Sequence, residues 1–217
     1  MTEQRTPATE HQTMNTIIHA AFRRDLARLD RALATFTPGS RVRADQITDT
    51  WDNFSFQLRH HHEDEEMIFW PALRQLGAPD DLAGELEGEH EKMLAALEHA
   101  EGSMAAFHVD PSADRTRAAH NALTALSDVL LAHLAHEERD MEPISAANHK
   151  SPQIKHAQRV VQKAHKGNTG TLFAWLSDDA DADVKAGLRR EIPAPVLFLI
   201  RTIGGRDYNR RIASIWS

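Results

Sequence analysis

The segment HHHEDEEMIFWP, residues 60–71, places three histidines and four acidic residues in seven consecutive positions before an apolar run. A block of charge of this kind is usually the solvated face of a helix. The role of the segment therefore depends on whether any of these side chains points into a core. The spacing of the apolar residues on either side of the block addresses that question.

An apolar stripe passes through the block with the alternating three- and four-residue steps of a buried helical face. The positions on the stripe are Trp51, Phe54, Leu58, His61, Glu65, Ile68 and Ala72. His61 and Glu65 interrupt the stripe in register, so we expect both to be buried. The other polar residues of the block lie beside the stripe and are expected on the solvated face: His60, His62, Glu63, Asp64 and Glu66.

A second segment, HLAHEERDMEP at residues 133–143, repeats the arrangement, with His133 and Glu137 on a stripe of leucines. Two more histidines, His19 and His90, lie on apolar stripes of their own. His19 and His61 are 42 residues apart, and His90 and His133 are 43 apart. A shift of about 72 residues therefore superimposes the first half on the second, which indicates a duplicated helical hairpin.

The helical period continues along most of the chain, and Gly and Pro fall mainly between the periodic segments. We expect helices near residues 10–36, 46–76, 80–106 and 113–146, with Pro71 and Pro143 kinking or ending the second and fourth. Long helices with short connections predict an all-α protein, an antiparallel up-down four-helix bundle with additional C-terminal helices. The predicted bundle covers residues 11–146, and residues 150–217 form a basic helical extension packed on or beside it.

Composition limits the kinds of function. A hydrophobic fraction of 41% and a charged fraction of 26% are ordinary for a soluble globular protein. The chain has no cysteine, which excludes disulfides, thiolate metal sites and thiol nucleophiles. The first residues, MTEQRTPATEHQT, have neither the basic nor the apolar region of a leader, and no apolar run is long enough to span a bilayer. We therefore expect a cytoplasmic protein with no membrane partner.

Charge is distributed unevenly. Residues 150–217 carry 12 Lys and Arg against 6 Asp and Glu, which leaves a net charge of +6 there and −13 on residues 1–149. Either the extension binds an anionic partner or it folds back onto the acidic body, and the second interpretation is favoured. No nucleic-acid motif accompanies the basic residues. The apolar run 196–200 is expected to plug one end of the bundle or to join two copies in a homodimer.

Buried carboxylates need a counter-charge. Burying an ionised carboxylate is costly unless it is paired or binds a metal, and none of the four stripes contains Lys or Arg. The i,i+4 spacing puts each His and Glu on one helical face, ~6 Å apart along the axis. Imidazole and carboxylate ligands without thiolate favour iron or manganese over structural zinc. Glu66 and Glu138 would either orient the histidine rings or remain surface acids.

This pattern resembles the hemerythrin-like HHE cation-binding family, whose four-helix bundle has a lone His on the first helix and His-x-x-x-Glu on the second. The resemblance implies two non-haem iron ions with an oxo or hydroxo bridge, and manganese is less favoured. The implied ligands are His19, His61, Glu65, His90, His133 and Glu137. It leaves open whether Glu137 or Glu138 is the bridging acid, and it adds Glu87 as a candidate to support the ligands.

One departure from the family affects the expected function. Oxygen-carrying hemerythrins have a second His one turn after the first on the third helix, where this chain has Leu94. With four histidines, both metals would keep an open position for peroxide, oxygen or nitric oxide. The first hypothesis is therefore an oxidoreductase of catalase or peroxidase type, and the alternative is a module that binds or senses iron, oxygen or NO without turnover. Ferritin-like iron oxidation ranks lower because Glu-x-x-His occurs only at Glu87 and His90.

Overall fold

The structure is a computed structural model and describes residues 13–216. The predicted start of the first helix at residue 10 and the predicted start of the bundle at residue 11 lie outside the described residues. The N-terminal segment MTEQRTPATEHQT also lies outside them, apart from its last residue. Between residues 13 and 216 all regular structure is helical and no strand occurs. No helix in that range is both long and apolar enough to cross a membrane.

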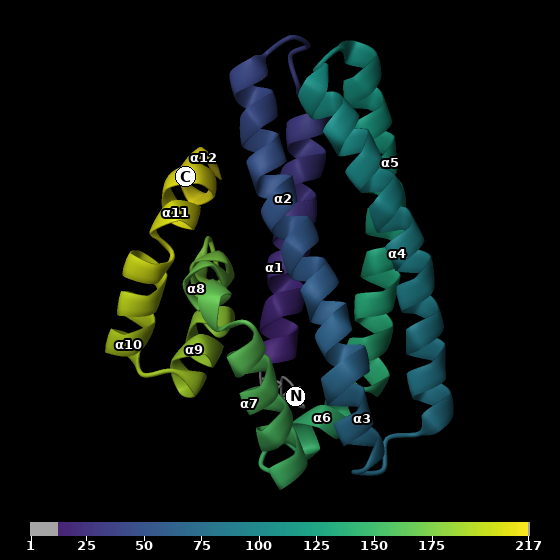
Figure 1. The fold of residues 1–217 in the computed structure, drawn as a ribbon, viewed down its shortest axis with the longest axis vertical. Helices are drawn as coiled ribbons and strands as arrows, with labels where there is room; N and C mark the ends of the chain where they lie inside the picture. Colours follow the sequence, from purple (N-terminus) through teal and green to yellow (C-terminus); the bar gives the residue numbers. More distant parts are fainter. Residues whose placement is uncertain (1–12, 217) are drawn as a thin grey trace, which may run out of the picture.

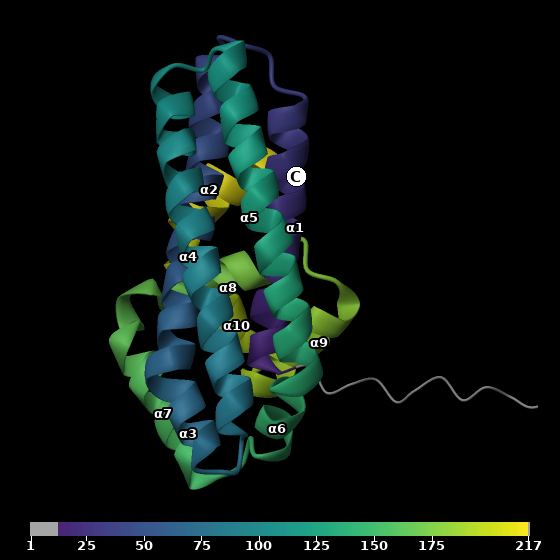
Figure 2. The same ribbon diagram turned by 90° about the vertical axis from the view of Figure 1, so that its right-hand side faces the viewer.

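Four long helices lie side by side (Figures 1 and 2). They are α1 (Met14–Ala34), α2 (Arg41–Asp64), α4 (Asp80–Val109) and α5 (Ala113–Asp140). The turn after α1 contains Gly39 at φ 85° and the turn before α4 contains Gly77 at φ 96°. Glycine adopts this left-handed backbone without the steric cost that other residues incur, so these two positions allow the chain to reverse between long helices.

The helix that carries the histidine block changes its pitch within the block. After α2, a π-helical turn (η1, Glu65–Phe69) leads into α3 (Trp70–Arg74), and the backbone N–H of Trp70 donates to the carbonyl of Glu65. A π turn is wider than an α turn, so the residues after Glu65 are rotated. Trp70 is consequently buried while Ile68 is only partly buried. The expected stripe is therefore confirmed at Ala72, which is buried, whereas Ile68 is only partly buried and Trp70 takes the buried position that the stripe did not predict.

The fourth predicted helix is also interrupted near its proline. It ends at Asp140, and the chain resumes after Met141 as α6 (Glu142–Ala147), with Pro143 in the first turn. Proline lacks the N–H that a continuous helix would need, so it is tolerated at the start of a helix. Both prolines thus lie at the interruptions that the sequence predicts.

The apolar core is divided into two clusters. The larger fills the space between the long helices and includes Leu58, Met93 and Leu130, while the smaller includes Trp70, Leu86 and Met141 together with residues of α7 (Pro152–Ala164). Along α2, α4 and α5, the buried histidines and glutamates lie between residues of the first cluster and residues of the second. The polar layer is therefore enclosed by apolar side chains on both sides.

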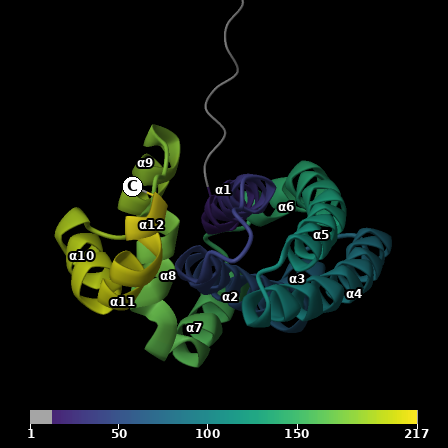
Figure 3. The same cartoon turned by 90° about the horizontal axis from the view of Figure 1, so that it is seen from above.

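The C-terminal extension packs against α1 and α2 (Figures 1 and 3). The extension, which the sequence predicts to be helical, begins with two helices, α7 and α8 (Thr169–Ser177), separated by a 3₁₀ turn (η2, Lys166–Asn168). The remaining elements are α9 (Ala182–Glu191), α10 (Ala194–Leu199), the π turn η3 (Ile200–Gly204), α11 (Arg206–Tyr208), the π turn η4 (Asn209–Ala213) and α12 (Ser214–Trp216).

A buried polar network joins the extension to α1. Asp25 is 1% exposed, and Trp175 Nε1–H donates to its carboxylate at 2.6 Å. Arg28 donates to Asp178 at 2.6 Å, and the Tyr208 hydroxyl donates to the same carboxylate at 3.0 Å. Hydrogen bonds to charged groups are the stronger class. In this network the arginine is on the bundle and the acid is on the extension, and the opposite arrangement also occurs, since Arg211 of the extension pairs with Asp49 of α2.

The apolar run 196–200 does not plug the end of the bundle. Only Leu197 is buried there, and Val196, Phe198 and Leu199 are 47%, 56% and 53% exposed. Trp175 and Tyr208 are buried and Trp216 is partly buried, so these aromatic residues provide the packing that was expected of the apolar run.

The crossing of α8 and η3 generates a prediction about stability. A Cβ atom at Gly170 would overlap the backbone of Gly204, whereas one at Gly167 would meet nothing within 4 Å. Overpacking of this kind costs about 1–3 kcal/mol. Gly170→Ala should lower the free energy of unfolding by about that amount, and the matched control Gly167→Ala should be close to neutral. Urea titration followed by circular dichroism measures both, and equal values would contradict the tight crossing.

Candidate metal centre

Seven buried side chains converge in two groups that share one glutamate. The three-histidine group consists of His62, Glu65, His90 and His133. The two-histidine group consists of His19, His61, Glu65 and Glu137. Within each group, one ligand atom from every residue lies within 4.8 Å of the others. The structure thus brings together all six residues that the sequence nominated, and adds His62.

The expectation that His62 is solvated is wrong. Its side chain is only 7% exposed, and Nε2 is buried without a hydrogen bond. Its ring centroid lies 4.3 Å from that of His90 and 5.3 Å from that of His133. A helix in a bundle contacts two neighbours, so its buried face is wider than one stripe. The internal repeat contains a signal that His62 is buried. A shift of 72 residues aligns His62 with Leu134, an apolar residue that is fully buried in the structure.

The role assigned to Leu94 also needs correction. Leu94 is 42% exposed, whereas the preceding Met93 is 3% exposed and belongs to the core. An imidazole at position 94 would therefore point away from the two groups. Because His62 supplies a fifth converging imidazole, the four-histidine count and the two open positions inferred from it no longer hold.

Carboxylates hold the outer nitrogens of three rings. Nδ1 of His19 lies 2.9 Å from Glu138, Nδ1 of His90 lies 2.7 Å from Glu66, and Nδ1 of His133 lies 3.0 Å from Glu89. A carboxylate accepts the proton of Nδ1–H, which leaves Nε2 of the neutral ring with its lone pair facing inward. Glu66 and Glu138 thus occupy the orienting positions that the sequence suggested.

Two other acids differ from expectation. Glu89 was not nominated, although it precedes His90 and reaches across to α5, where it contacts both His133 and His136. Glu87 does not support the ligands, because it accepts a hydrogen bond from Arg74 at 2.7 Å. A helical stripe does not identify side chains that extend to a neighbouring helix. Sequence periodicity therefore could not show that Glu89, and not Glu87, contacts the histidines.

The inward-facing atoms of the two groups lie close together, and the facing nitrogens of His90 and His133 have no proton to share. Nε2 of His90 and Nε2 of His133 are 3.1 Å apart, and both rings already donate from Nδ1. The Nε2 atoms of His19 and His61 are 3.2 Å apart. Both oxygens of Glu65 and Oε2 of Glu137 are buried without a hydrogen bond, and each such atom costs about 1–3 kcal/mol. These donors fit a cation, which would satisfy all of them together.

Burial controls the protonation of the histidines. Burial and the neighbouring His133 lower the pKa of His90 to about 3. Burial likewise holds the pKa values of His61 and His62 well below their usual range. Neutral imidazole is the form that binds metals. His19 is the exception, since burial would lower its pKa but hydrogen bonds and charges from Glu137 and Glu138 raise it to about 9.

The carboxylates of the two groups differ in protonation. Burial, reinforced by the charge on Glu137, raises the pKa of Glu65 well above its usual range. Burial would also raise the pKa of Glu137, but hydrogen bonding and charge from His19 lower it instead. Protons on Glu65 and His19 thus partly compensate the buried charge, and a cation would displace them.

Aromatic side chains enclose the two groups on different sides. The Trp70 ring stacks on His90 with centroids 4.6 Å apart and an interplanar angle of 22°. Phe22 lies 5.5 Å from His61, and Trp175 lies 5.2 Å behind Phe22. These contacts fix the ring orientations and exclude water. The extension therefore contributes to the surroundings of His61 through Trp175.

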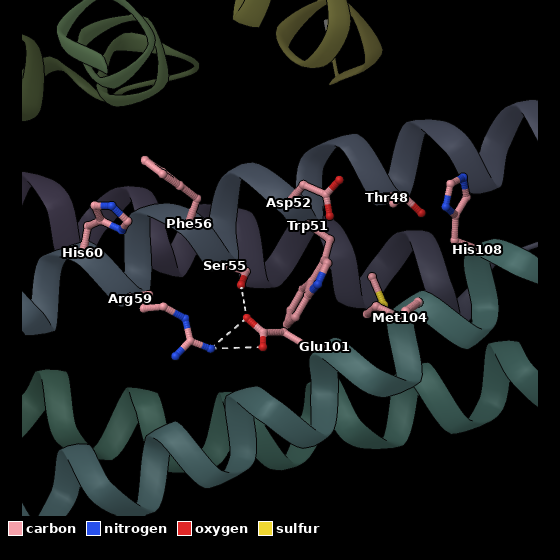
Figure 4. A pocket seen from close by; sticks show the side chains of 11 residues that line it. Thr48, Trp51, Asp52, Ser55, Phe56, Arg59, His60, Glu101, Met104 and His108 are labelled. Atoms are coloured by element: carbon pink, nitrogen blue, oxygen red, sulfur yellow. Dashed lines mark hydrogen bonds and ion pairs between the residues drawn. The ribbon is translucent and has the colours of Figure 1, made fainter. Parts of the chain in front are cut away.

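A surface pocket of about 430 Å³ lies elsewhere, along α2 and α4 (Figure 4). Its charged residues pair with each other, since Glu101 accepts hydrogen bonds from Ser55 at 2.6 Å and Arg59 at 3.0 Å. None of the seven converging residues lines it. The chemistry of the chain is therefore placed in the buried layer and not in this pocket.

One comparison with known protein families gives a match. The hemerythrin HHE cation binding domain matches residues 16–145, more than half of the chain. Among curated proteins there is no significant match, and the same is true of solved structures. The match spans all seven converging residues, from His19 to Glu137. The chain belongs to the hemerythrin HHE cation-binding family.

Proposed function

We propose that the two groups hold two non-haem iron ions, one in each, and that this centre reacts with hydrogen peroxide or a related small oxidant. The observation that carries the proposal is the convergence of five imidazoles and two carboxylates, among which Nε2 of His62, both oxygens of Glu65 and Oε2 of Glu137 are buried without a hydrogen bond. Glu65 belongs to both groups, so it is the residue best placed to bridge them. Glu137 is the second bridging candidate, because Glu138 is occupied by His19 and Arg23.

The donor set favours iron. Imidazole suits iron, carboxylate and water suit manganese, and two histidines with a carboxylate form the set that non-haem iron uses when positions stay open for oxygen chemistry. The two-histidine group has this composition. Its four protein ligands leave room for a bridging oxygen and a small oxidant. When bound, the iron pair would pass two electrons from one hydrogen peroxide to another, so that two peroxides give two waters and one dioxygen.

The side chains around the centre have separate tasks in this proposal. Glu66, Glu89 and Glu138 hold the imidazoles in the tautomer that binds metal. Trp70 and Phe22 keep the interior dry, which strengthens every electrostatic interaction inside it. Asn15 donates to Oε1 of Glu137 at 3.1 Å and so fixes one oxygen of that carboxylate. The protein thus positions the donors before the cation arrives.

The alternative is a module that binds or senses iron, dioxygen or nitric oxide without turnover. It requires the same donors. The extension gives it structural support, because Trp175 of α8 packs on Phe22, which packs on His61. A change at the centre could reach the extension through these contacts.

Metal content is the first prediction. Protein produced in iron-replete cells should contain two irons per chain and show the absorption of an oxo-bridged ferric pair. Elemental analysis and the visible spectrum of the oxidised protein measure this. Less than one metal per chain would count heavily against the proposal.

The histidine block supplies a matched pair for the second prediction. His62→Leu should lose about one metal per chain, because it removes an imidazole from the three-histidine group. His60→Leu is the control, since His60 stacks on Phe56 at 4.1 Å and belongs to neither group. Metal content after equal loading measures both variants. Equal retention by the two would remove His62 from the ligand set.

The reaction with hydrogen peroxide distinguishes the proposed oxidoreductase from the sensor module. Iron-loaded protein should consume hydrogen peroxide rapidly and release oxygen, measured with an oxygen electrode, and His62→Leu at matched protein concentration should be slower. Reversible binding of dioxygen or nitric oxide with no peroxide consumption would favour the sensor. Metal-free protein serves as the blank.

A further inference from the structure

The two halves of the duplicated hairpin differ at one pair of positions next to the metal centre. In the repeat, Trp70 corresponds to Glu142, since each precedes a proline and lies five residues after the buried glutamate of its half. Leu86 corresponds to Asn15, since each lies four residues before the histidine of its helix. In the folded bundle, Trp70 and Leu86 form an apolar pair and Glu142 and Asn15 form a polar pair, and each pair takes one residue from each half.

The apolar pair closes the three-histidine group. Trp70 is 1% exposed and stacks on His90, and Leu86 is fully buried in the same apolar cluster. No polar atom of these two side chains is available to guide a charged species towards the group. Entry of a cation from this side would require a large apolar ring to move.

The polar pair lies beside the two-histidine group. Nδ2 of Asn15 donates to Oε1 of Glu137 at 3.1 Å and also to Oε2 of Glu142 at 3.2 Å. Glu142 is 8% exposed, and its other oxygen, Oε1, is buried and makes no hydrogen bond. A single amide therefore connects a ligand carboxylate to a third carboxylate with an unused oxygen. Such an oxygen is costly to bury unless something binds it.

We infer that Asn15 and Glu142 form an entry site through which a divalent cation reaches the two-histidine group. The inference rests on the proposed metal centre and adds the route by which it is filled. Glu142 attracts the hydrated cation and replaces part of its water, and the shared amide keeps Glu137 within reach for the transfer. Hard oxygen ligands suit this transient role, and the imidazoles deeper in the group retain the metal.

Loading of metal-free full-length protein with Co²⁺ tests the inference. Binding can be followed by the visible absorbance that Co²⁺ gains with imidazole ligands, and by the fluorescence of the four tryptophans, of which Trp70 contacts His90. Glu142→Gln keeps the shape of the side chain and removes its charge. It should slow loading about tenfold at low salt while the final content stays at the wild-type value.

Two further variants make the test specific. Asn15→Leu introduces the residue type found at the corresponding position, Leu86, and should also slow loading. Circular dichroism shows whether each variant is folded. Glu101→Gln removes one charge from the pocket of Figure 4, where Glu101 pairs with Arg59, and should load at the wild-type rate. Equal slowing in Glu101→Gln would assign the effect to overall charge and overturn the entry site.

The remaining outcomes are also decisive. Wild-type rates in both Glu142→Gln and Asn15→Leu would overturn the entry site and leave the metal centre intact. A lower final content in Glu142→Gln would overturn it as well, because Glu142 would then be a permanent ligand. Failure of the wild-type protein to bind Co²⁺ or Fe²⁺ at all would overturn the proposed centre together with its entry route.

Discussion

The structure depends on carboxylates that are buried in an apolar core without a basic residue beside them. Glu65 is 4% exposed and Glu137 is 2% exposed, and histidines face both of them, while the amide of Asn15 donates to Glu137. An unpaired carboxylate in such a place costs several kcal/mol. Apolar clusters above and below the layer increase that cost because they exclude water. The arrangement is therefore consistent with a fold that is completed by a cation, and the outer acids that hold Nδ1 of three rings support this view.

Local helix geometry adapts to the layer. Glu65 begins the π turn, and the wider turn rotates the following residues so that Trp70 reaches the ring of His90. A regular α-helix would place Ile68 on the buried stripe and turn Trp70 aside. The interruption at Met141 has the same effect in the other half, where it directs Glu142 towards Asn15. In both halves a proline follows, which lacks the N–H that a regular helix would use.

Periodicity accounts for most of what could be predicted. A stripe of apolar residues identifies each buried position along one helix, so His19, His61, Glu65, His90, His133 and Glu137 follow from spacing, and the family match over residues 16–145 agrees with the recognised pattern. Spacing does not show how wide the buried face is, which is why it predicts a solvated His62, and the significance given to Leu94 came from the family resemblance and not from spacing. Spacing also does not show which side chains extend to a neighbouring helix, so it does not identify Glu89, which contacts His133 on α5. The extension follows no repeat, and its anchoring through Asp25 and Asp178 depends on contacts about 150 residues apart in sequence.

Duplication explains why the two halves contribute similar residues to the buried layer, and divergence explains why the two groups differ in access. The same backbone position carries Trp70 in one half and Glu142 in the other, and only the second has a charged side chain. Each group is bordered by one residue from each half: Trp70 and Leu86 lie on the side of the three-histidine group, and Asn15 and Glu142 lie beside the two-histidine group. The group with fewer nitrogens is therefore the one beside the polar pair. If both groups had the apolar pair, the buried carboxylates would have no polar approach. If both had the polar pair, the interior would lose the aromatic stacking that fixes His90. The asymmetry between the two groups meets both requirements, because one side keeps the layer rigid and dry while the other admits what the carboxylates need.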